Sequence, residues 1–111
     1  MGAIESRVGR ANRLTRPVLF MPAARVELIE AQDWYERQAP GLGRKFRDEV
    51  DVQVGRIAVR PLRFPVMLND VRRARLRRFP YSLFFRPLQD AIYVIACFHS
   101  SRDPNVWQGR A

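Results

Sequence analysis

The stretch that decides the fold is residues 71–99, VRRARLRRFPYSLFFRPLQDAIYVIACFH. Polar and apolar residues alternate from Val71 to Arg77, the period of a strand with one buried face. A second strand is expected over Tyr81–Arg86, and the turn formers Pro87–Asp90 separate it from a third. The run Ala91–Phe98 is apolar on both faces, which is typical of a central strand. The second half of the chain therefore predicts three consecutive strands.

The first half predicts a short strand followed by two helices. Val18–Phe20 is a brief apolar run, and Pro22 suits the first turn of a helix. Apolar residues then recur every three or four positions over residues 24–35 and again over residues 42–57. Only Pro40-Gly41 interrupts the pattern, so the two helices should form an antiparallel hairpin. Gly55 inside the second helix would fit close packing at that point.

These elements predict an α+β fold with the order β-α-α-β-β-β, a small and mostly antiparallel sheet with the helical hairpin packed on one face. The other face would then display arginines. Residues 61–65 should form a loop, Asn69-Asp70 a turn, and residues 99–111 a loop or short turn that packs through Trp107. Trp34 and Tyr35 are expected in the core. We expect residues 1–16 to be a flexible basic tail and residues 17–111 to be one domain.

The charge of the chain indicates a polyanionic or acidic partner. The formal net charge is +9 over 111 residues, with +3 in residues 1–21 and +6 in residues 71–111, and 19 of the 20 basic residues are arginine. Nucleic acid or an acidic protein would complement it. The single cysteine, Cys97, excludes an intrachain disulfide, and no cofactor or metal site is expected. Neither a membrane span nor a secretory signal is recognisable, so a cytoplasmic location without a membrane partner is expected.

A dense arginine cluster is the clearest candidate binding feature. Five of the seven residues at 72–78 are arginine: Arg72, Arg73, Arg75, Arg77 and Arg78. Strand alternation would place three of them on one face, about 6.6–7 Å apart, which is close to the phosphate spacing of a single nucleic-acid strand. Such a ladder could follow a nucleic-acid backbone or bind an acidic protein. It could also be a solvated face whose charge provides solubility.

Several strings in this order resemble toxins of the RelE/ParE superfamily, which belong to type II toxin–antitoxin systems. They are the strand-to-helix start at Val18–Ala24, Glu30-Ala31 with Trp34-Tyr35, Pro40–Gly43 followed by Phe46, Pro61, Val71–Arg73, Arg78–Tyr81, and His99–Pro104 with Trp107. The resemblance implies one of two activities. RelE-type members are ribosome-dependent mRNA endonucleases, whereas ParE-type members poison DNA gyrase without cutting nucleic acid. It also implies a cognate antitoxin that silences the toxin in a hetero-oligomer.

His99, the only histidine, separates the two activities. In a nuclease that acts on mRNA at the ribosome, His99 would be the general acid or base and Arg73 would stabilise charge on the phosphate. A structural hydrogen-bonding role is the other interpretation, and ParE-like sequences resemble this chain in carrying a histidine here. RelE-type nucleases typically present a lysine cluster and a C-terminal tyrosine. This chain has only Lys45, and no tyrosine follows Tyr93.

The residue inventory therefore favours a ParE-like toxin of the plasmid-stabilisation type that inhibits gyrase and arrests growth. The nuclease is the alternative, and a simple nucleic-acid-binding module is the third interpretation. Residues expected to bind the target or the antitoxin are Arg72, Arg73, Arg75, Arg77, Arg78, Arg102 and Trp107. Trp107 would either anchor the target or fold back to seal the sheet.

Overall fold

A computed structural model describes residues 16–111 as one α+β unit. Its elements are β1 (Val18–Phe20), α2 (Pro22–Gln38), α3 (Leu42–Val59), the 3-10 turn η1 (Pro61–Arg63), β2 (Val66–Leu68), β3 (Val71–Arg75), β4 (Tyr81–Pro87), β5 (Ile92–His99) and α4 (Asn105–Gln108). Most of the predicted basic tail, residues 1–15, lies outside the described residues. Its last residue, Arg16, donates a hydrogen bond from its guanidinium to the Leu88 carbonyl at 2.6 Å.

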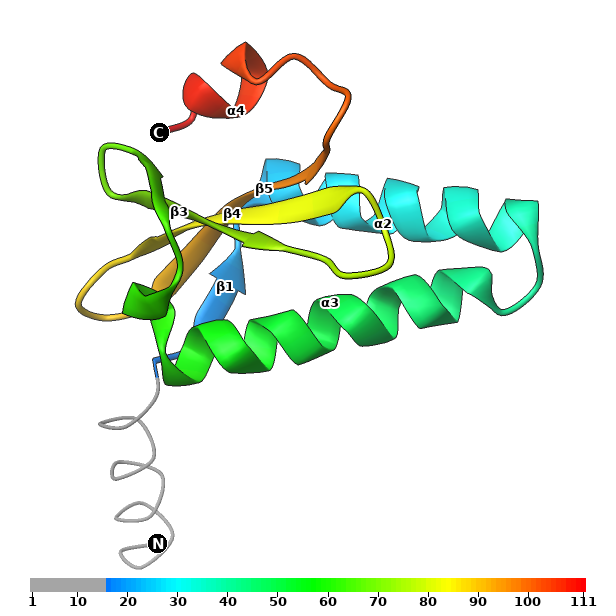
Figure 1. Ribbon diagram of the computed structural model, residues 1–111, viewed down its shortest axis with the longest axis horizontal. Helices are drawn as coiled ribbons and strands as arrows, with labels where there is room; N and C mark the ends of the chain where they lie inside the picture. Colours follow the sequence, from blue (N-terminus) through cyan, green and yellow to red (C-terminus); the bar gives the residue numbers. More distant parts are fainter. Residues whose placement is uncertain (1–15) are drawn as a thin grey trace, which may run out of the picture.

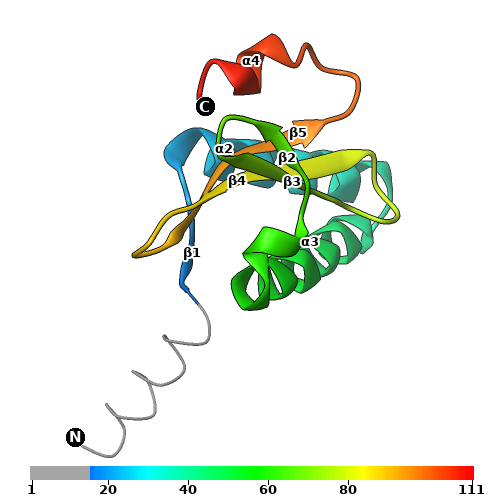
Figure 2. The same cartoon turned by 60° about the vertical axis from the view of Figure 1, so that its left-hand side comes forward.

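The sheet has the strand order β1-β5-β4-β3-β2, and β1–β5 is its parallel pair (Figure 1 and Figure 2). The expected mostly antiparallel sheet is thus confirmed. β5 is interior, paired with β1 on one side and β4 on the other, although β4 is the middle strand. The edge strand β2 was not predicted. It forms because Asn69, at φ 52°, adopts the left-handed conformation that asparagine tolerates, and so turns the chain back to pair with β3.

The predicted helical hairpin, α2 and α3, covers one face of the sheet (Figure 1). Gly41, at φ 87°, makes the turn between the helices. A Cβ on Gly43 would lie 2.6 Å from the Gln32 carbonyl oxygen, so the close approach of the helices requires glycine there. The Glu36 carboxylate caps the start of α3 by accepting the N–H groups of Gly41 and Gly43 at 2.9 and 3.0 Å. Phe46, Val50 and Ile57 from α3 form the centre of this core.

The opposite face of the sheet is not the open arginine surface that the sequence predicted. It carries a second, smaller core of Val71, Phe84, Ile95, Ala96, Phe98 and Trp107. The register between β4 and β5 shifts at Phe84/Phe85, so Ile95 and Ala96 both turn to this face. The short helix α4 covers it, on the other side of the sheet from the hairpin (Figure 1). The run Ala91–Phe98 is apolar on both faces because both are covered.

Two other expectations were wrong. A Cβ built on Gly55 would have no atom of residues 16–111 within 4 Å, so close packing within this part of the chain does not explain the glycine. Trp34 is 49% exposed rather than a core residue, whereas its neighbour Tyr35 is buried as predicted. None of the helices in residues 16–111 is long and apolar enough to span a membrane.

Candidate functional site

Five of the predicted site residues line a hollow of about 340 Å³ on the second face of the sheet: Arg73, Arg75, His99, Arg102 and Trp107. We call it the basic hollow. β3 contributes Arg73 and Arg75, β5 contributes His99, and the segment leading to α4 contributes Arg102. Aromatic side chains of the second core form part of its wall. The fold thus brings together predicted site residues that lie up to 34 positions apart in the sequence, the separation of Arg73 and Trp107.

The arginine ladder is shorter than the sequence predicted. β3 ends at Arg75, because Glu49 of α3 accepts the backbone N–H groups of Arg77 and Arg78 and holds them in the turn before β4. The side chains of Arg77 and Arg78 are exposed, and neither residue lines the hollow. Arg72 points to the opposite side of the sheet from Arg73.

Arg72 supports the chain before β2. Its guanidinium donates to the carbonyl oxygens of Leu62 and Phe64 at 3.1 and 2.7 Å. These bonds fix η1 and the following segment against β3. The position of Arg72 in the cluster therefore has a structural explanation that the sequence pattern did not reveal.

Arg73 and Arg75 keep most of their donors available. Nε of Arg73 is buried and has no hydrogen-bond partner among residues 16–111. A buried, charged donor without an acceptor is costly, and an incoming carboxylate or phosphate oxygen would satisfy it. Arg75 is exposed, and its backbone carbonyl is held by Nε2 of Gln53 at 2.7 Å. Both guanidinium groups therefore line a hollow that lacks a counter-ion of its own.

The hydrogen bonds of His99 limit what its imidazole can do. Nδ1 accepts the backbone N–H of Ser101 at 3.0 Å, and the Ser101 hydroxyl lies 2.7 Å from the same nitrogen. An N–H can only donate, so Nδ1 is unprotonated and the neutral ring carries its proton on Nε2. The ring also packs against Tyr81, with the two centroids 5.1 Å apart and the planes nearly perpendicular. His99 therefore offers a donor to a ligand, while its free lone pair is already used by Ser101.

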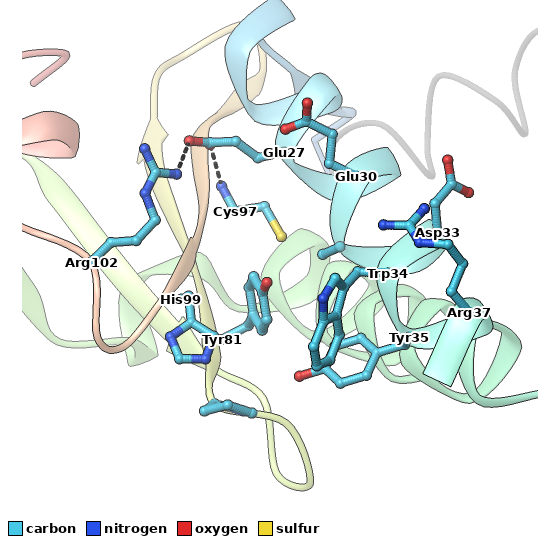
Figure 3. A pocket seen from close by; sticks show the side chains of 12 residues that line it. Glu27, Glu30, Asp33, Trp34, Tyr35, Arg37, Tyr81, Cys97, His99 and Arg102 are labelled. Carbon is cyan, nitrogen blue, oxygen red and sulfur yellow. Dashed lines mark hydrogen bonds and ion pairs between the residues drawn. The ribbon is translucent and has the colours of Figure 1, made fainter. Parts of the chain in front are cut away.

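Glu27 holds the C-terminal segment in place, and the sequence analysis missed it. Its carboxylate accepts hydrogen bonds from Arg102 at 2.8 Å and from the backbone N–H of Cys97 at 3.1 Å (Figure 3). It also accepts two hydrogen bonds from Arg110, at 2.9 and 3.0 Å. Burial alone would raise the pKa of Glu27, but these hydrogen bonds outweigh it and hold the pKa below its usual value. One signal was available: Glu27 flanks the buried stripe of α2 that includes Ala24 and Ala31.

Arg102 and Arg110 position the wall formed by α4. Arg110 also donates to the Ile95 carbonyl at 2.9 Å, and the Arg102 guanidinium lies over the Phe98 ring, 4.3 Å from its centroid. Trp107 is 4% exposed and stacks on Phe84, with the centroids 4.1 Å apart. Trp107 thus folds back onto the sheet, the second of the two roles that the sequence allowed.

A larger cleft of about 800 Å³ adjoins the basic hollow and shares His99 and Arg102 with it (Figure 3). Trp34 and Tyr81 provide aromatic surface there. Burial raises the pKa of Tyr81, so its phenol is a poor proton acceptor near neutral pH. Burial, together with the charge of Glu27, raises the pKa of Cys97 to about 12, which keeps its thiol protonated and unreactive.

The basic hollow presents hydrogen-bond donors that suit anionic groups. Among residues 16–111, no lysine, aspartate or glutamate lines it. Within residues 16–111, no group of three or more histidine, cysteine, aspartate or glutamate side chains could hold a metal ion. What the hollow offers is arginine donors, the Nε2 proton of His99 and aromatic walls.

Comparison with known proteins identifies the family of the chain and a solved structure with a similar fold. A family described as the ParE toxin of the type II toxin–antitoxin system parDE matches residues 18–104. Among solved structures, a chain from the chromosomal ParDE toxin–antitoxin system of P. aeruginosa superposes with a TM-score of 0.68 at 20% sequence identity. The match covers 77% of this chain and 96% of that one. None of the curated proteins matches the sequence significantly.

Proposed function

Because the chain belongs to the ParE toxin family of type II toxin–antitoxin systems, we propose that it arrests growth by binding and inhibiting DNA gyrase in the cytoplasm. A cognate antitoxin neutralises it by forming a toxin–antitoxin complex. The observation that carries the proposal is the composition of the basic hollow: unpaired arginine donors converge there without a free proton acceptor. A toxin that acts by binding needs such arginine donors and does not need a proton acceptor.

Arginine suits this task for physical reasons. Its planar guanidinium presents donors in a fixed fork that matches carboxylate and phosphate oxygens, and it stays protonated at any pH the cell reaches. Arg73 and Arg75 project from a rigid strand of the sheet, while Arg102 is oriented by its ion pair with Glu27. The side chain of Arg102 is therefore held in place before a ligand binds, which reduces the side-chain entropy that it loses on binding.

A ribosome-dependent mRNA endonuclease is the second candidate, because His99 and Arg73 line the same hollow. The geometry disfavours it. A general base needs a lone pair directed at the 2′-hydroxyl, whereas Nδ1 of His99 is engaged by Ser101 and Nε2 carries the proton. Arg73 and Arg75 cannot accept a proton either.

The proposal is tested in a supercoiling assay with purified protein, gyrase, relaxed plasmid and ATP. Loss of supercoiling in proportion to toxin concentration, relieved by the antitoxin, supports gyrase inhibition. Undiminished supercoiling with a folded protein that still arrests growth rejects it. Cleavage of ribosome-bound mRNA by the same protein would then establish the nuclease.

Two matched arginine variants locate the activity in the hollow. Arg73→Ala should weaken inhibition of supercoiling by about tenfold or more, because it removes a partly desolvated donor. Arg77→Ala removes the same charge from the exposed turn outside the hollow and should change inhibition by less than about twofold. Equal losses would mean that overall charge, and not the hollow, drives binding.

A further inference from the structure

The outer side of α3 and η1 forms an apolar surface that the core does not use. Among residues 16–111, the three most exposed large apolar side chains are Leu62, Val52 and Val59, at 64%, 61% and 57%. Val52 and Val59 are two helical turns apart on α3, and Leu62 follows in η1. Single exposed apolar residues are ordinary on a protein surface. Three neighbouring apolar side chains with the largest exposed fractions indicate a binding surface. We call these three residues, together with Gly55, Arg56, Arg60 and Arg63, the α3–η1 surface.

Gly55 opens a groove in this surface. A groove of about 620 Å³ runs past Val52, Gly55 and Val59 to Phe64. A Cβ on Gly55 would meet no atom of the described part of the chain within 4 Å, so residues 16–111 gain no packing from having glycine there. Glycine in the middle of a helix is unfavourable relative to alanine. What Gly55 does provide is room for another backbone to approach α3 closely.

Three arginines border the groove and define the charge of its ligand. Arg56, Arg60 and Arg63 all line it, and none of them forms an ion pair within residues 16–111. The nearby carboxylate of Asp51 is already paired with Arg47 at 3.1 Å. A ligand with acidic groups on both sides of an apolar strip would complement this surface.

We propose that the α3–η1 surface binds an acidic amphipathic helix of the antitoxin, separately from the basic hollow. Apolar residues of that helix would contact Val52, Val59 and Leu62, a small residue would cross at Gly55, and flanking carboxylates would pair with the arginines. This spacing along α3 is the one that a helix packed in a groove uses. The inference rests on the proposed function only for the identity of the partner.

Other occupants match the surface less well. A second copy of the chain would place these arginines opposite their own equivalents, which repel one another. Residues 1–15 contain three arginines and one acidic residue, so they too have the wrong charge. Nucleic acid would match the arginines but would leave Val52, Val59 and Leu62 against a polar backbone.

The test uses Gly55→Leu, which fills the groove without disturbing the core. Because space is open at this position and leucine favours helix, the variant should melt at the same or a higher temperature than the wild type. Calorimetric titration with the full-length antitoxin should show at least about tenfold weaker binding. Supercoiling inhibition by the free variant should be unchanged, whereas the antitoxin concentration that relieves it should rise in parallel.

A charge-reversal pair tests the role of the arginines. Arg60→Glu should weaken antitoxin binding about fivefold at low salt and less at 0.5 M salt, where screening is stronger. Arg37→Glu, an exposed position in the last turn of α2 at the opposite end of the hairpin, makes the same change in net charge and should alter binding by less than about twofold. Antitoxin affinity that is unchanged by Gly55→Leu overturns the inference. The inference is also overturned if Gly55→Leu loses binding to double-stranded DNA while it keeps its affinity for the antitoxin. Nucleic acid would then be the ligand of this surface.

These outcomes are distinguishable from failure of the proposed function. If the wild-type chain does not inhibit gyrase, the calorimetric comparison still reports whether the antitoxin uses this surface. If gyrase is inhibited and Gly55→Leu is neutralised like the wild type, only the inference about α3 and η1 fails.

Discussion

Glu27→Gln should loosen the C-terminal segment, and its cost can be worked out from the contacts. The Glu27 side chain is 10% exposed, while those of Arg110 and Arg102 are 25% and 44% exposed. Glutamine keeps an acceptor for the Cys97 N–H, so the loss comes from the two arginines. The half-buried pair with Arg110 contributes about 1.5 kcal/mol and the more exposed pair with Arg102 about 0.5 kcal/mol. The free energy of unfolding should therefore fall by about 2 kcal/mol.

Urea unfolding at pH 7 and pH 3 measures this directly, and the pH dependence has a definite sign. The folded-state pKa of Glu27 lies below the ordinary glutamate value of 4.5. The stability that the ionised Glu27 carboxylate contributes is therefore complete above about pH 4.5. This stability is lost as the pH falls through the folded-state pKa. The difference between wild type and Glu27→Gln should be largest at neutral pH and should shrink in acid.

Glu30→Gln is the matched control, because Glu30 is an exposed carboxylate on the same helix that forms no ion pair within residues 16–111. It should change stability by less than about 0.5 kcal/mol. Our assignment of Glu27 is refuted if its substitution costs no more than the control at pH 7. It is also refuted if the difference from wild type is the same at pH 3.

Three further predictions concern packing and reactivity. Gly43→Ala should destabilise the fold by about 2 kcal/mol, because the new Cβ meets the Gln32 carbonyl oxygen at 2.6 Å. Gly55→Ala should instead stabilise the fold by up to about 1 kcal/mol. Thermal unfolding of both variants checks this contrast. Trp107→Ala should cost about 3 kcal/mol by uncovering the second core, and an unchanged urea midpoint would mean that α4 is not docked as described. Burial raises the pKa of Cys97 to about 12, so its thiol should resist iodoacetamide at pH 8 in the folded protein and react in urea. Mass spectrometry would detect the labelled chain. Rapid labelling of the folded protein would contradict the burial of Cys97.

Local patterns were sufficient to predict most of the fold. The apolar stripes of α2 and α3, the break at Pro40-Gly41 and the run in β5 each follow from a periodicity within a few neighbouring residues. β2 was missed because three residues are too few to show a period, and its formation depends on the backbone conformation of Asn69. The second core was missed because it joins Phe84 to Trp107, and no local pattern records a contact across that distance.

The candidate site was predicted in part, for the same reason. Arginine density drew attention to residues 72–78, but only Arg73 and Arg75 reach the hollow. Where β3 ends depends on Glu49, which lies on a different element. The role of Glu27 likewise depends on Arg110, 83 positions away. Side-chain partners that are distant in the sequence therefore decided which arginines remain available for a ligand.

The most direct test of the account is the activity of His99→Asn in cells and in the supercoiling assay. The Asn Oδ1 can take the place of Nδ1 and accept the Ser101 N–H, so the loop should be preserved while the Nε2 proton and any acid–base function are lost. We predict that the variant still inhibits gyrase and arrests growth, with inhibition weakened by no more than about tenfold because one neutral hydrogen-bond donor of the hollow is lost. Loss of growth arrest by a folded His99→Asn protein, with mRNA cleavage present in the wild type and absent in the variant, would contradict inhibition by binding and establish catalysis at His99.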